Sequence, residues 1–363
     1  MEAAEVDQAL VERFALFARA FRNGAPLYAR FAERVSTEPR ILALMSAAPA
    51  AQRLPVLLFA AVHHVLLQEP EHPLARYYPN LNTAPDSGES DPTDDAADEF
   101  VRFVAARFDT ISHLLRVRTV QTNEVGRCSW FLFPFALLDE EVGPLARVDI
   151  GSSAGLTLLF PDMTFDLGPG GSLGSSRDLV LHCEVRNGPP TPTTSPRLVW
   201  TLGLDPRPVD LHDDDAVRWL EACIWPENTD RLLRFRRAVS LARSRNIVVE
   251  KGEALSDIEV AVARAREHAH PVVTTSWVLN YLSPNAREAF VAELDRLGSM
   301  FDLSWVIAES PRETPELPVP TTGEEDITVL SLVTWREGRR AVRRLATVHP
   351  HGDWINWDVR EPT

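Results

Sequence analysis

Hydrophobic side chains in the first third of the chain recur at the spacing of an amphipathic helix. Val6, Leu10, Phe14 and Phe17 lie three or four residues apart, so one face of a helix would be apolar. Three prolines separate the successive helical stretches of this region: Pro39, Pro49 and Pro55. The pattern predicts an α-helical N-terminal domain over residues 1–118.

After residue 118 the pattern changes to short apolar runs that alternate with helical stretches. The expected strands are 146–150, 198–204, 246–250, 271–276, 304–309, 327–335 and 341–348. The expected helices are 154–160, 214–225, 229–244, 255–268 and 284–297. This alternation is typical of an α/β domain whose mostly parallel sheet is covered on both faces. Residues 119–363 are therefore predicted to form one such domain.

Two features depart from simple alternation. The turn Arg336–Arg339 is too short for a crossover helix, so the last two expected strands must form an antiparallel hairpin. The Pro- and Gly-rich insertion 161–197 is expected to carry a hairpin of its own, made of 164–167 and 179–184. The main sheet is thus predicted to be Rossmann-like, with seven strands and a C-terminal antiparallel hairpin.

Charge and composition exclude several classes of protein. A net charge of −15 at pH 7 disfavours broad, non-specific binding to nucleic acid. No run reaches the about 20 apolar residues of a membrane span, and the acidic N-terminus lacks the apolar core of a signal peptide. We therefore expect a cytoplasmic protein with no membrane partner. Lys251 is the single lysine and no P-loop motif surrounds it.

The first candidate site is a strand, a glycine turn and a helix start. Gly151 permits a sharp reversal, Gly155 allows close packing, and the expected helix N-terminus would present free N–H groups to a ligand. Ser153 stands where a dinucleotide fingerprint needs its second glycine, which disfavours NAD. The candidate cofactor-binding residues here are Asp149, Gly151, Ser152, Ser153 and Gly155.

Carboxylates follow the next two expected strands. Asp205 ends the strand 198–204 and could accept hydrogen bonds from ribose hydroxyls, with Asp166 as a rival at closer spacing. Glu253 follows the strand 246–250 and is a further cofactor-binding candidate. A solvated aspartate and a helix N-terminal carboxylate are the simpler explanations of Asp205 and Glu253.

The expected strand 271–276 runs into a loop and then a helix that begins at Pro284. Asn280 and Tyr281 are candidate catalytic residues, because either could position a nucleophilic substrate atom. Core packing would explain Tyr281 equally well. Three further residues near strand ends complete the set, Ser276 for the cofactor and Trp277 and Glu309 for the substrate.

In their order along the chain, these motifs resemble those of class I S-adenosylmethionine-dependent methyltransferases. The glycine turn resembles D-x-G-x-x-x-G, Gly203-Leu204-Asp205 resembles the pattern at the ribose, and Glu253 matches an acid near the adenine amino group. The resemblance implies S-adenosylmethionine as cofactor and methyl transfer to a small molecule, for example in secondary metabolism. The chain would act as a homo-oligomer or with a partner subunit.

A second resemblance covers nearly the whole chain. The segments that look like the bacterial domain-of-unknown-function family 2332 are 61–63, 77–79, 122–127, 154–156, 208–211, 225–226 and 349–354. This resemblance implies functional positions at Asn123, Glu124, Arg127 and His351. Arg127 could clamp a carboxylate, and Glu124 or His351 could act as a general base. An i,i+3 helical pair is the simpler explanation of Glu124 and Arg127.

The chain departs from the pattern of family 2332 at two places in the glycine-turn region. Asp149 stands where the family has Glu, and Thr157 stands where it has Asn. Both positions fall in the expected cofactor loop. They leave open whether this member binds the cofactor.

Other interpretations stay open. Gly151–Gly155 also matches G-x-S-x-G, so a serine hydrolase could use Ser153 with Asp205 and either His349 or His351. A methyltransferase-like enzyme could instead carry out elimination or cyclisation without the cofactor, and a non-catalytic partner subunit is a further alternative. The histidine pairs lack the acid spacing of a metal site, so no metal is expected.

Overall fold

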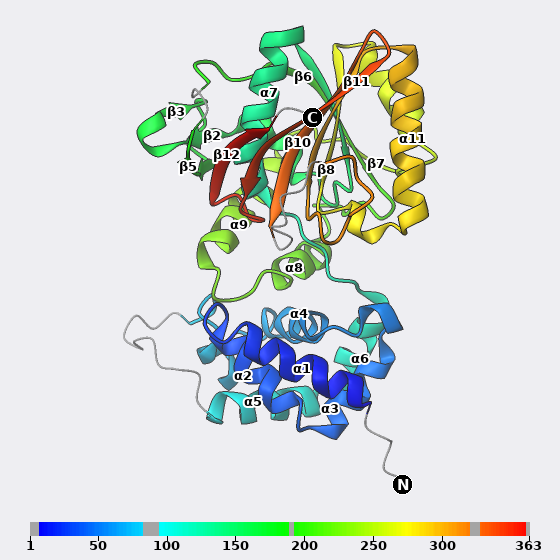
Figure 1. Cartoon of the computed structure of the whole chain (residues 1–363). Helices are drawn as coiled ribbons and strands as arrows, with labels where there is room; N and C mark the ends of the chain where they lie inside the picture. Colours follow the sequence, from blue (N-terminus) through cyan, green and yellow to red (C-terminus); the bar gives the residue numbers. More distant parts are fainter. Residues whose placement is uncertain (1–6, 83–93, 189–191, 320–326, 361–363) are drawn as a thin grey trace. The chain divides into compact units, whose positions relative to one another are not determined.

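The computed structural model describes residues 7–82, 94–188, 192–319 and 327–360 (Figure 1). The chain forms two compact units. The helical unit contains the described residues up to Thr122 together with His212–Leu233, and the α/β unit contains Asn123–Leu211 and the described residues from Arg234 onward. Residues 212–233 thus belong to the helical unit, although they follow the first strands of the α/β unit in the chain.

The helical unit is built around a helix that is apolar on every side. Its helices are α1 (Gln8–Ala20), α2 (Pro26–Val35), α3 (Pro39–Leu44), α4 (Pro55–Leu66), α5 (Asp94–Ala106), α6 (Phe108–Val117), α8 (Asp214–Ala222) and the start of α9 (Thr229–Arg243). Prolines occupy the first position of α2, α3 and α4, where no backbone donor is needed. Nearly all of α4 is buried, as expected for a helix with apolar residues all round. Phe59 on α4 packs 4.6 Å from the ring of Tyr28 and 6.2 Å from that of Phe14.

The α/β unit contains a nine-stranded sheet with the order β5-β12-β11-β10-β9-β8-β1-β6-β7. Five adjacent strands are parallel: β7 (Val249–Lys251), β6 (Leu198–Asp205), β1 (Leu145–Ile150), β8 (His270–Ser276) and β9 (Leu303–Glu309). Three antiparallel strands continue it: β10 (Thr328–Arg336), β11 (Arg339–Val348) and β12 (Trp354–Arg360). β5 (Glu184–Arg186) closes this end, parallel to β12.

Helices cover both faces of the parallel strands (Figure 1). Ala146, Val148 and Ile150 of β1 belong to a core shared with α10 (Ile258–Arg266) and α11 (Pro284–Met300). The alternate residues of β1 face α7 (Cys128–Val142), where the Arg147 guanidinium lies 4.9 Å from the ring centre of Phe131. The second face of β1 therefore carries polar side chains in a buried position.

Several expectations about the sheet are confirmed. The seven predicted strands are present, and β10 and β11 form the predicted antiparallel hairpin. Its turn residues Glu337 and Gly338 have φ values of 50° and 74°, the left-handed conformation of a tight hairpin turn.

Other expectations about the α/β unit are wrong. The sheet has nine strands instead of the predicted seven, and the two additional strands are β5 and β12. In the insertion, β2 (Thr164–Asp166) pairs parallel with β4 (Val180–His182) and antiparallel with β3 (Ser172–Leu173), so the predicted hairpin of 164–167 with 179–184 does not form. The helix predicted at 154–160 is the 3₁₀ helix η5 (Leu156–Asp162), which contains Pro161. Residues 189–191 of the insertion lie outside the described residues.

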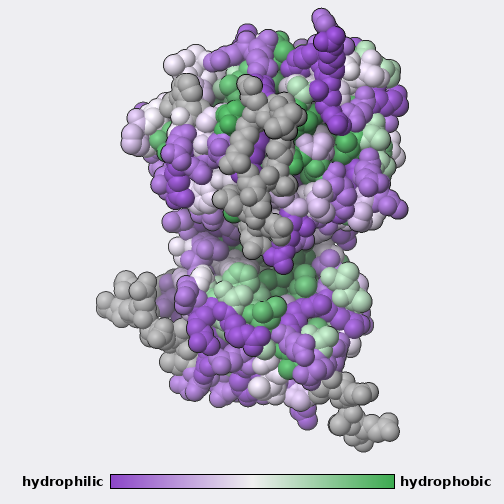
Figure 2. All heavy atoms as spheres, viewed as in Figure 1, coloured by the Kyte–Doolittle hydropathy of each residue, from purple (hydrophilic) through white to green (hydrophobic). Residues whose placement is uncertain are grey.

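Hydrophilic side chains dominate the visible surface of each unit, in keeping with the strongly acidic composition (Figure 2). None of the helices in the described ranges is both long enough and apolar enough to cross a lipid bilayer.

Candidate functional site

The candidate residues gather at the carboxyl ends of the parallel strands. The connection from β1 leads to β6 on one side, whereas β8 lies on the other side of β1, so the strand order reverses between β1 and β8. Ligands of open α/β sheets bind outside the carboxyl ends of the strands beside such a reversal. At this edge lie Gly151 after β1, Asp205 at the end of β6, Ser276 at the end of β8 and Glu309 at the end of β9.

Packing within the chain explains the glycines of the turn after β1. Gly151 and Gly155 have φ values of 74° and 72°, which favour glycine. A Cβ atom on Gly151 would lie 2.2 Å from Cγ2 of Val278, and one on Gly155 would lie 2.6 Å from Cγ2 of Val249. Neighbouring side chains therefore occupy the space that each glycine leaves open.

Four of the five backbone amides of this turn, those of Gly151, Ser152, Ser153 and Gly155, are already paired, whereas the sequence predicted free N–H groups. Gly151 and Ser152 both donate to the carbonyl of Leu204, at 2.8 and 3.2 Å, and Gly155 donates to Ser152 at 2.8 Å. Ser153 donates to the carboxylate of Asp205 at 2.8 Å. The seven-residue 3₁₀ helix that follows is not the α-helix whose N-terminus was expected to bind a ligand.

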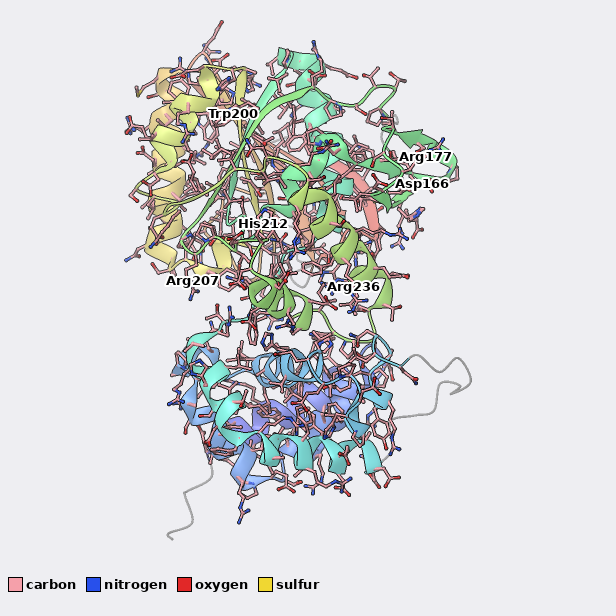
Figure 3. All side chains as sticks on the ribbon, turned by 180° about the vertical axis from the view of Figure 1, so that it is seen from behind. Asp166, Arg177, Trp200, Arg207, His212 and Arg236 are labelled. Atoms are coloured by element: carbon pink, nitrogen blue, oxygen red, sulfur yellow. The ribbon has the colours of Figure 1, made fainter. Side chains whose placement is uncertain are left out.

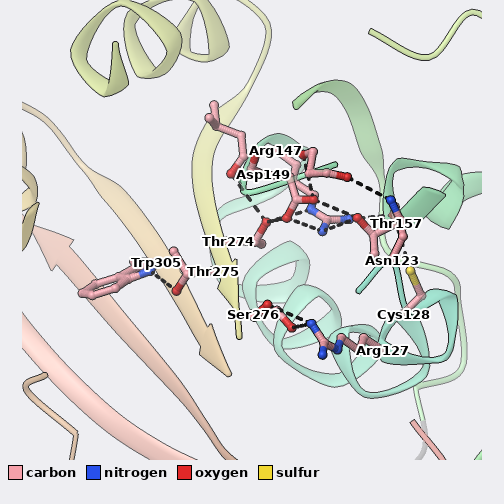
Figure 4. A network of polar contacts seen from close by, with 12 residues as sticks. Asn123, Arg127, Cys128, Arg147, Asp149, Thr157, Thr274, Thr275, Ser276 and Trp305 are labelled. Carbon is pink, nitrogen blue, oxygen red and sulfur yellow. Dashed lines mark hydrogen bonds and ion pairs between the residues drawn. The ribbon is translucent and has the colours of Figure 1, made fainter. Parts of the chain in front are cut away.

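Asp149 is part of a buried network on the α7 side of β1 rather than an open ligand (Figure 4). Its Oδ1 accepts hydrogen bonds from Arg147 and Thr274, and its Oδ2 accepts from Ser152 and Thr157. Four donors fill the acceptor positions of a carboxylate. Asp149 and Thr157, the two positions at which the sequence led us to expect departures from the family pattern, are thus direct partners, 2.8 Å apart.

Asp205 also serves the local structure. Its two carboxylate oxygens accept hydrogen bonds from the backbone amides of Ser153 and Arg207, both at 2.8 Å. Asp205 is only 9% exposed. The chain after Asp205 returns to the glycine turn, where Val209 donates to the carbonyl of Ser153 at 3.1 Å. The rival Asp166 lies in the small sheet beside His182, apart from Arg207 (Figure 3).

These contacts test the fit of S-adenosylmethionine to the predicted residues. The prediction required free amides at Gly151–Gly155 and an accessible carboxylate at Asp205, and the structure holds these groups in internal hydrogen bonds. Glu253, expected near adenine, is exposed, and its amide donates to Asp257 at 2.8 Å. In this structure several of the groups that were predicted to hold the cofactor are thus engaged in contacts within the chain.

Of the acidic residues at this edge, Glu309 has the most strongly shifted pKa. Only 3% exposed, it accepts hydrogen bonds at Oε1 from the amides of Val278 and Leu279, at 3.1 and 3.3 Å. Burial raises the pKa of Glu309 to about 7, against the opposing effects of these amides and of the charges on Arg127 and Arg287. A carboxyl group with this pKa can give or take a proton near neutral pH.

The three candidate residues in the loop after β8 differ from one another in their contacts and in their exposure. Trp277 adopts a φ of 54°, unusual for a bulky residue, and its indole nitrogen donates to Thr328 at 2.9 Å. Tyr281 is 67% exposed, so core packing does not explain it. Asn280 is half-buried, with Oδ1 buried and without a partner among the described residues.

The segment 123–127 meets the loop 349–353 between β11 and β12. A Cβ atom on Gly126 would lie 2.1 Å from the carbonyl oxygen of His351, so the two backbones touch. The hydroxyl of Ser129 lies 2.8 Å from the carbonyl oxygens of both Gly126 and Gly352, and the indole of Trp130 donates to His349 at 3.1 Å. Two family segments more than 200 residues apart in sequence thus form one structure.

Arg127 anchors this structure to the sheet edge. Its Nε donates to the carbonyl of Pro350 at 3.0 Å, and its Nη1 donates to the carbonyl and hydroxyl of Ser276 at 2.9 and 3.2 Å (Figure 4). Asn123 donates through Nδ2 to the carbonyl of Ser152 at 3.3 Å. Because a carbonyl oxygen only accepts hydrogen bonds, the side-chain NH2 group of Asn123 must face Ser152. Oδ1 of Asn123 therefore faces away from Ser152 and is an acceptor.

Glu124 and His351 form a pair within this structure. Glu124 is 5% exposed, and its Oε1 accepts from the amide of Gly126 at 2.9 Å and lies 3.3 Å from Nη2 of Arg234. Its Oε2 lies 3.5 Å from Nδ1 of His351, whose side chain is 33% exposed. A buried carboxylate thus lies beside an accessible imidazole.

The sequence analysis missed Arg234 and Arg147. Arg234 lies on α9, 110 residues after Glu124, and nothing in the local sequence connects the two residues. Arg147 offered a signal, since an arginine inside an apolar strand two residues before Asp149 must be buried with a partner.

Among the described residues, no group of three or more His, Cys, Asp or Glu side chains is placed to hold a metal ion. Over residues 11–357 the chain matches a family described as an uncharacterized protein conserved in bacteria (DUF2332). No curated protein matches the chain.

Proposed function

The chain belongs to this uncharacterised bacterial family, and we propose that its α/β unit is an enzyme that moves protons on a small polar substrate at the carboxyl edge of the sheet. The observation that carries the proposal is the buried Glu124 carboxylate beside Nδ1 of the accessible His351, at 3.5 Å. A carboxylate in this position orients the imidazole and stabilises its protonated form. His351 is the general base of the proposal.

The local contacts suit each group to its role. Gly126 and Arg234 hold Glu124 at Oε1, which leaves Oε2 toward His351. The Glu124 carboxylate and Nδ1 of His351 are 3.5 Å apart without a hydrogen bond between them, so Glu124 acts on His351 through its charge, which favours the protonated imidazole.

Glu309 is the proton donor of the proposal. Its Oε2 is buried and has no hydrogen-bond partner among the described residues, and its pKa of about 7 keeps part of the population protonated at neutral pH. Arg127 connects the two groups, because it donates to Pro350 next to His351 and its charge acts on Glu309. In an elimination of water, one group takes a proton from a carbon atom of the substrate while the other gives a proton to the oxygen that leaves as water.

The unpartnered oxygens at this edge indicate the polarity of the substrate. Oδ1 of Asn123, Oδ1 of Asn280 and Oε2 of Glu309 are buried at this edge and have no hydrogen-bond partner among the described residues. Amide and carboxylate oxygens accept hydrogen bonds, so a substrate rich in hydroxyl or amino groups would pair with them. This argues for a polyhydroxylated or amino-bearing small molecule.

Methyl transfer from S-adenosylmethionine is a second candidate function. It is favoured by the reversal of strand order between β1 and β8 and by an acid, Asp205, at the end of β6. Because backbone amides of the glycine turn are already hydrogen-bonded within the chain, we rank methyl transfer below proton transfer. Calorimetric titration of the protein with S-adenosylmethionine separates the two, since proton transfer without the cofactor requires no binding.

The main test is a comparison of variants on a bacterial metabolite extract. Wild-type protein and the His351→Gln variant are incubated with the extract, and consumed and formed compounds are followed by mass spectrometry. We expect compounds that the wild type converts and the variant leaves intact. His182→Gln, an exposed histidine in the small sheet, is the matched control. Equal conversion by wild type and His351→Gln would remove His351 from the reaction.

A further inference from the structure

Polar groups gather in the core of the helical unit. Tyr28 lies on α2 and Tyr78 follows α4 in the chain; they are 1% and 0% exposed, with ring centres 6.3 Å apart. The ring of Trp225 lies 6.1 Å from that of Tyr28. Glu227, two residues after Trp225, accepts a hydrogen bond at Oε1 from the amide of Leu27 at 3.0 Å.

Three of the segments by which the chain resembles its family meet here. The segment 61–63 contributes His63, the segment 77–79 contributes Tyr78, and the segment 225–226 precedes Glu227. The rings of His63 and Tyr78 lie 5.3 Å apart. The proposed function makes no use of these segments.

Four polar side chains of this cluster, Tyr28, Tyr78, Asn80 and Glu227, each keep one atom without a hydrogen-bond partner in the described part of the chain. Among the described residues, the hydroxyls of Tyr28 and Tyr78, Oδ1 of Asn80 and Oε2 of Glu227 are buried without a hydrogen-bond partner. Nδ2 of Asn80 lies 3.0 Å from Nε2 of His63, whose Nδ1 lies 3.2 Å from the carbonyl of Ala222. Since a carbonyl only accepts, His63 carries its proton on Nδ1 and accepts from Asn80, which leaves Oδ1 of Asn80 unpaired.

The charge of Glu227 acts on both tyrosines. Burial raises the pKa of Tyr28 and of Tyr78 well above the ordinary value, and the Glu227 carboxylate raises both further. Burial also raises the pKa of Glu227, which the amides of Leu27 and Tyr28 oppose. No described ion pair compensates Glu227.

The unpaired groups match one small ligand. The two phenols offer hydrogens, whereas Glu227 and Asn80 offer acceptor oxygens. We propose that the helical unit binds an internal water molecule that accepts from the hydroxyls of Tyr28 and Tyr78 and donates to the oxygens of Glu227 and Asn80. Buried waters of this kind make two to four hydrogen bonds to groups that would otherwise be unsatisfied. The water would connect α2, the segment 78–80 and the chain between α8 and α9.

The sign of a tyrosine-to-phenylalanine effect tests the proposal. Removing a hydroxyl that has no partner stabilises a core or leaves it unchanged, whereas removing one that binds an ordered water destabilises it. In the full-length protein, Tyr28→Phe and Tyr78→Phe are each expected to lower the hydrogen-exchange protection of α2 about fivefold. The double variant is expected to lose less than the product of the single losses, because both changes release the same water.

Controls separate the water from other occupants. Tyr77→Phe removes a neighbouring hydroxyl outside the cluster and should leave protection unchanged. Protection that is unchanged or increased in Tyr28→Phe and Tyr78→Phe would overturn the proposal. Protection that rises with added ammonium or potassium chloride, but not with sodium chloride, would also overturn it, because a cation bound at Glu227 would then be the ligand.

Discussion

Replacing Glu309 by Gln should stabilise the α/β unit at high pH and leave it unchanged at low pH. The substitution keeps the shape of the side chain and an acceptor oxygen for the amides of Val278 and Leu279. It removes only the charge, which the wild type must form in a buried place. The variant therefore isolates the free-energy cost of ionising this carboxyl group.

The magnitude follows from the shift in pKa. Burial raises the pKa of Glu309 from 4.5 to about 7, and each pKa unit corresponds to about 1.4 kcal/mol. Between these two values the folded protein binds more protons than the unfolded chain, so its stability falls as the pH rises. By pH 8 the wild type should have lost about 3 kcal/mol that Glu309→Gln retains.

Urea unfolding followed by circular dichroism, at intervals from pH 4 to pH 8, gives the difference in stability between the two proteins. We expect this difference to be near zero at pH 4 and to grow across the interval up to pH 7. Glu313→Gln, an exposed glutamate in the segment after β9, should show no such growth. If the difference is the same at pH 4 and pH 8, Glu309 does not ionise in a buried site and cannot be the proposed proton donor.

Four further outcomes are expected. Burial lowers the pKa of His270 to about 4, so wild-type stability should fall as the pH drops from 6.5 to 4, and His270→Gln should lessen this fall by about 3 kcal/mol in acid urea unfolding. Ser153→Gly should raise the stability by about 1 kcal/mol at pH 7, because Ser153 has a φ of 53° that glycine adopts without strain. A fluorophosphonate probe should leave Ser153 unlabelled in mass spectra, since this residue is only 6% exposed; labelling would restore the hydrolase alternative. Asp149→Glu and Thr157→Asn should each lower the melting temperature by several degrees, and the double variant should recover part of the loss, because the two side chains are hydrogen-bonded partners.

The alternation of apolar runs predicted six strands of the main sheet because each contains apolar residues that face its core, and it predicted only part of the edge strand β7, whose residues are not buried. It failed for β5 and β12 for a physical reason. β5 is three residues long, and β12 mixes Trp354 and Ile355 with polar residues, so neither has a clear period. Their pairing is set by contacts with β11 and with each other, which no local pattern encodes.

The failure at the glycine turn has a different origin. The spacing of Gly151 and Gly155 indicated a turn with positive φ, and the structure has one. It could not indicate whether the space beside each glycine holds a ligand or a side chain. Val278 and Val249, which fill that space, are more than 90 residues away in the sequence.

Contacts between distant segments, rather than the glycine turn, determine where chemistry can occur in this chain. Gly126 and the backbone of His351 touch because neither side presents a Cβ atom at the contact, and this brings the imidazole beside Glu124. A larger residue at Gly126 would separate the pair without altering either member. Position 126 is therefore as decisive for the placement of His351 in the proposed proton transfer as Glu124 itself.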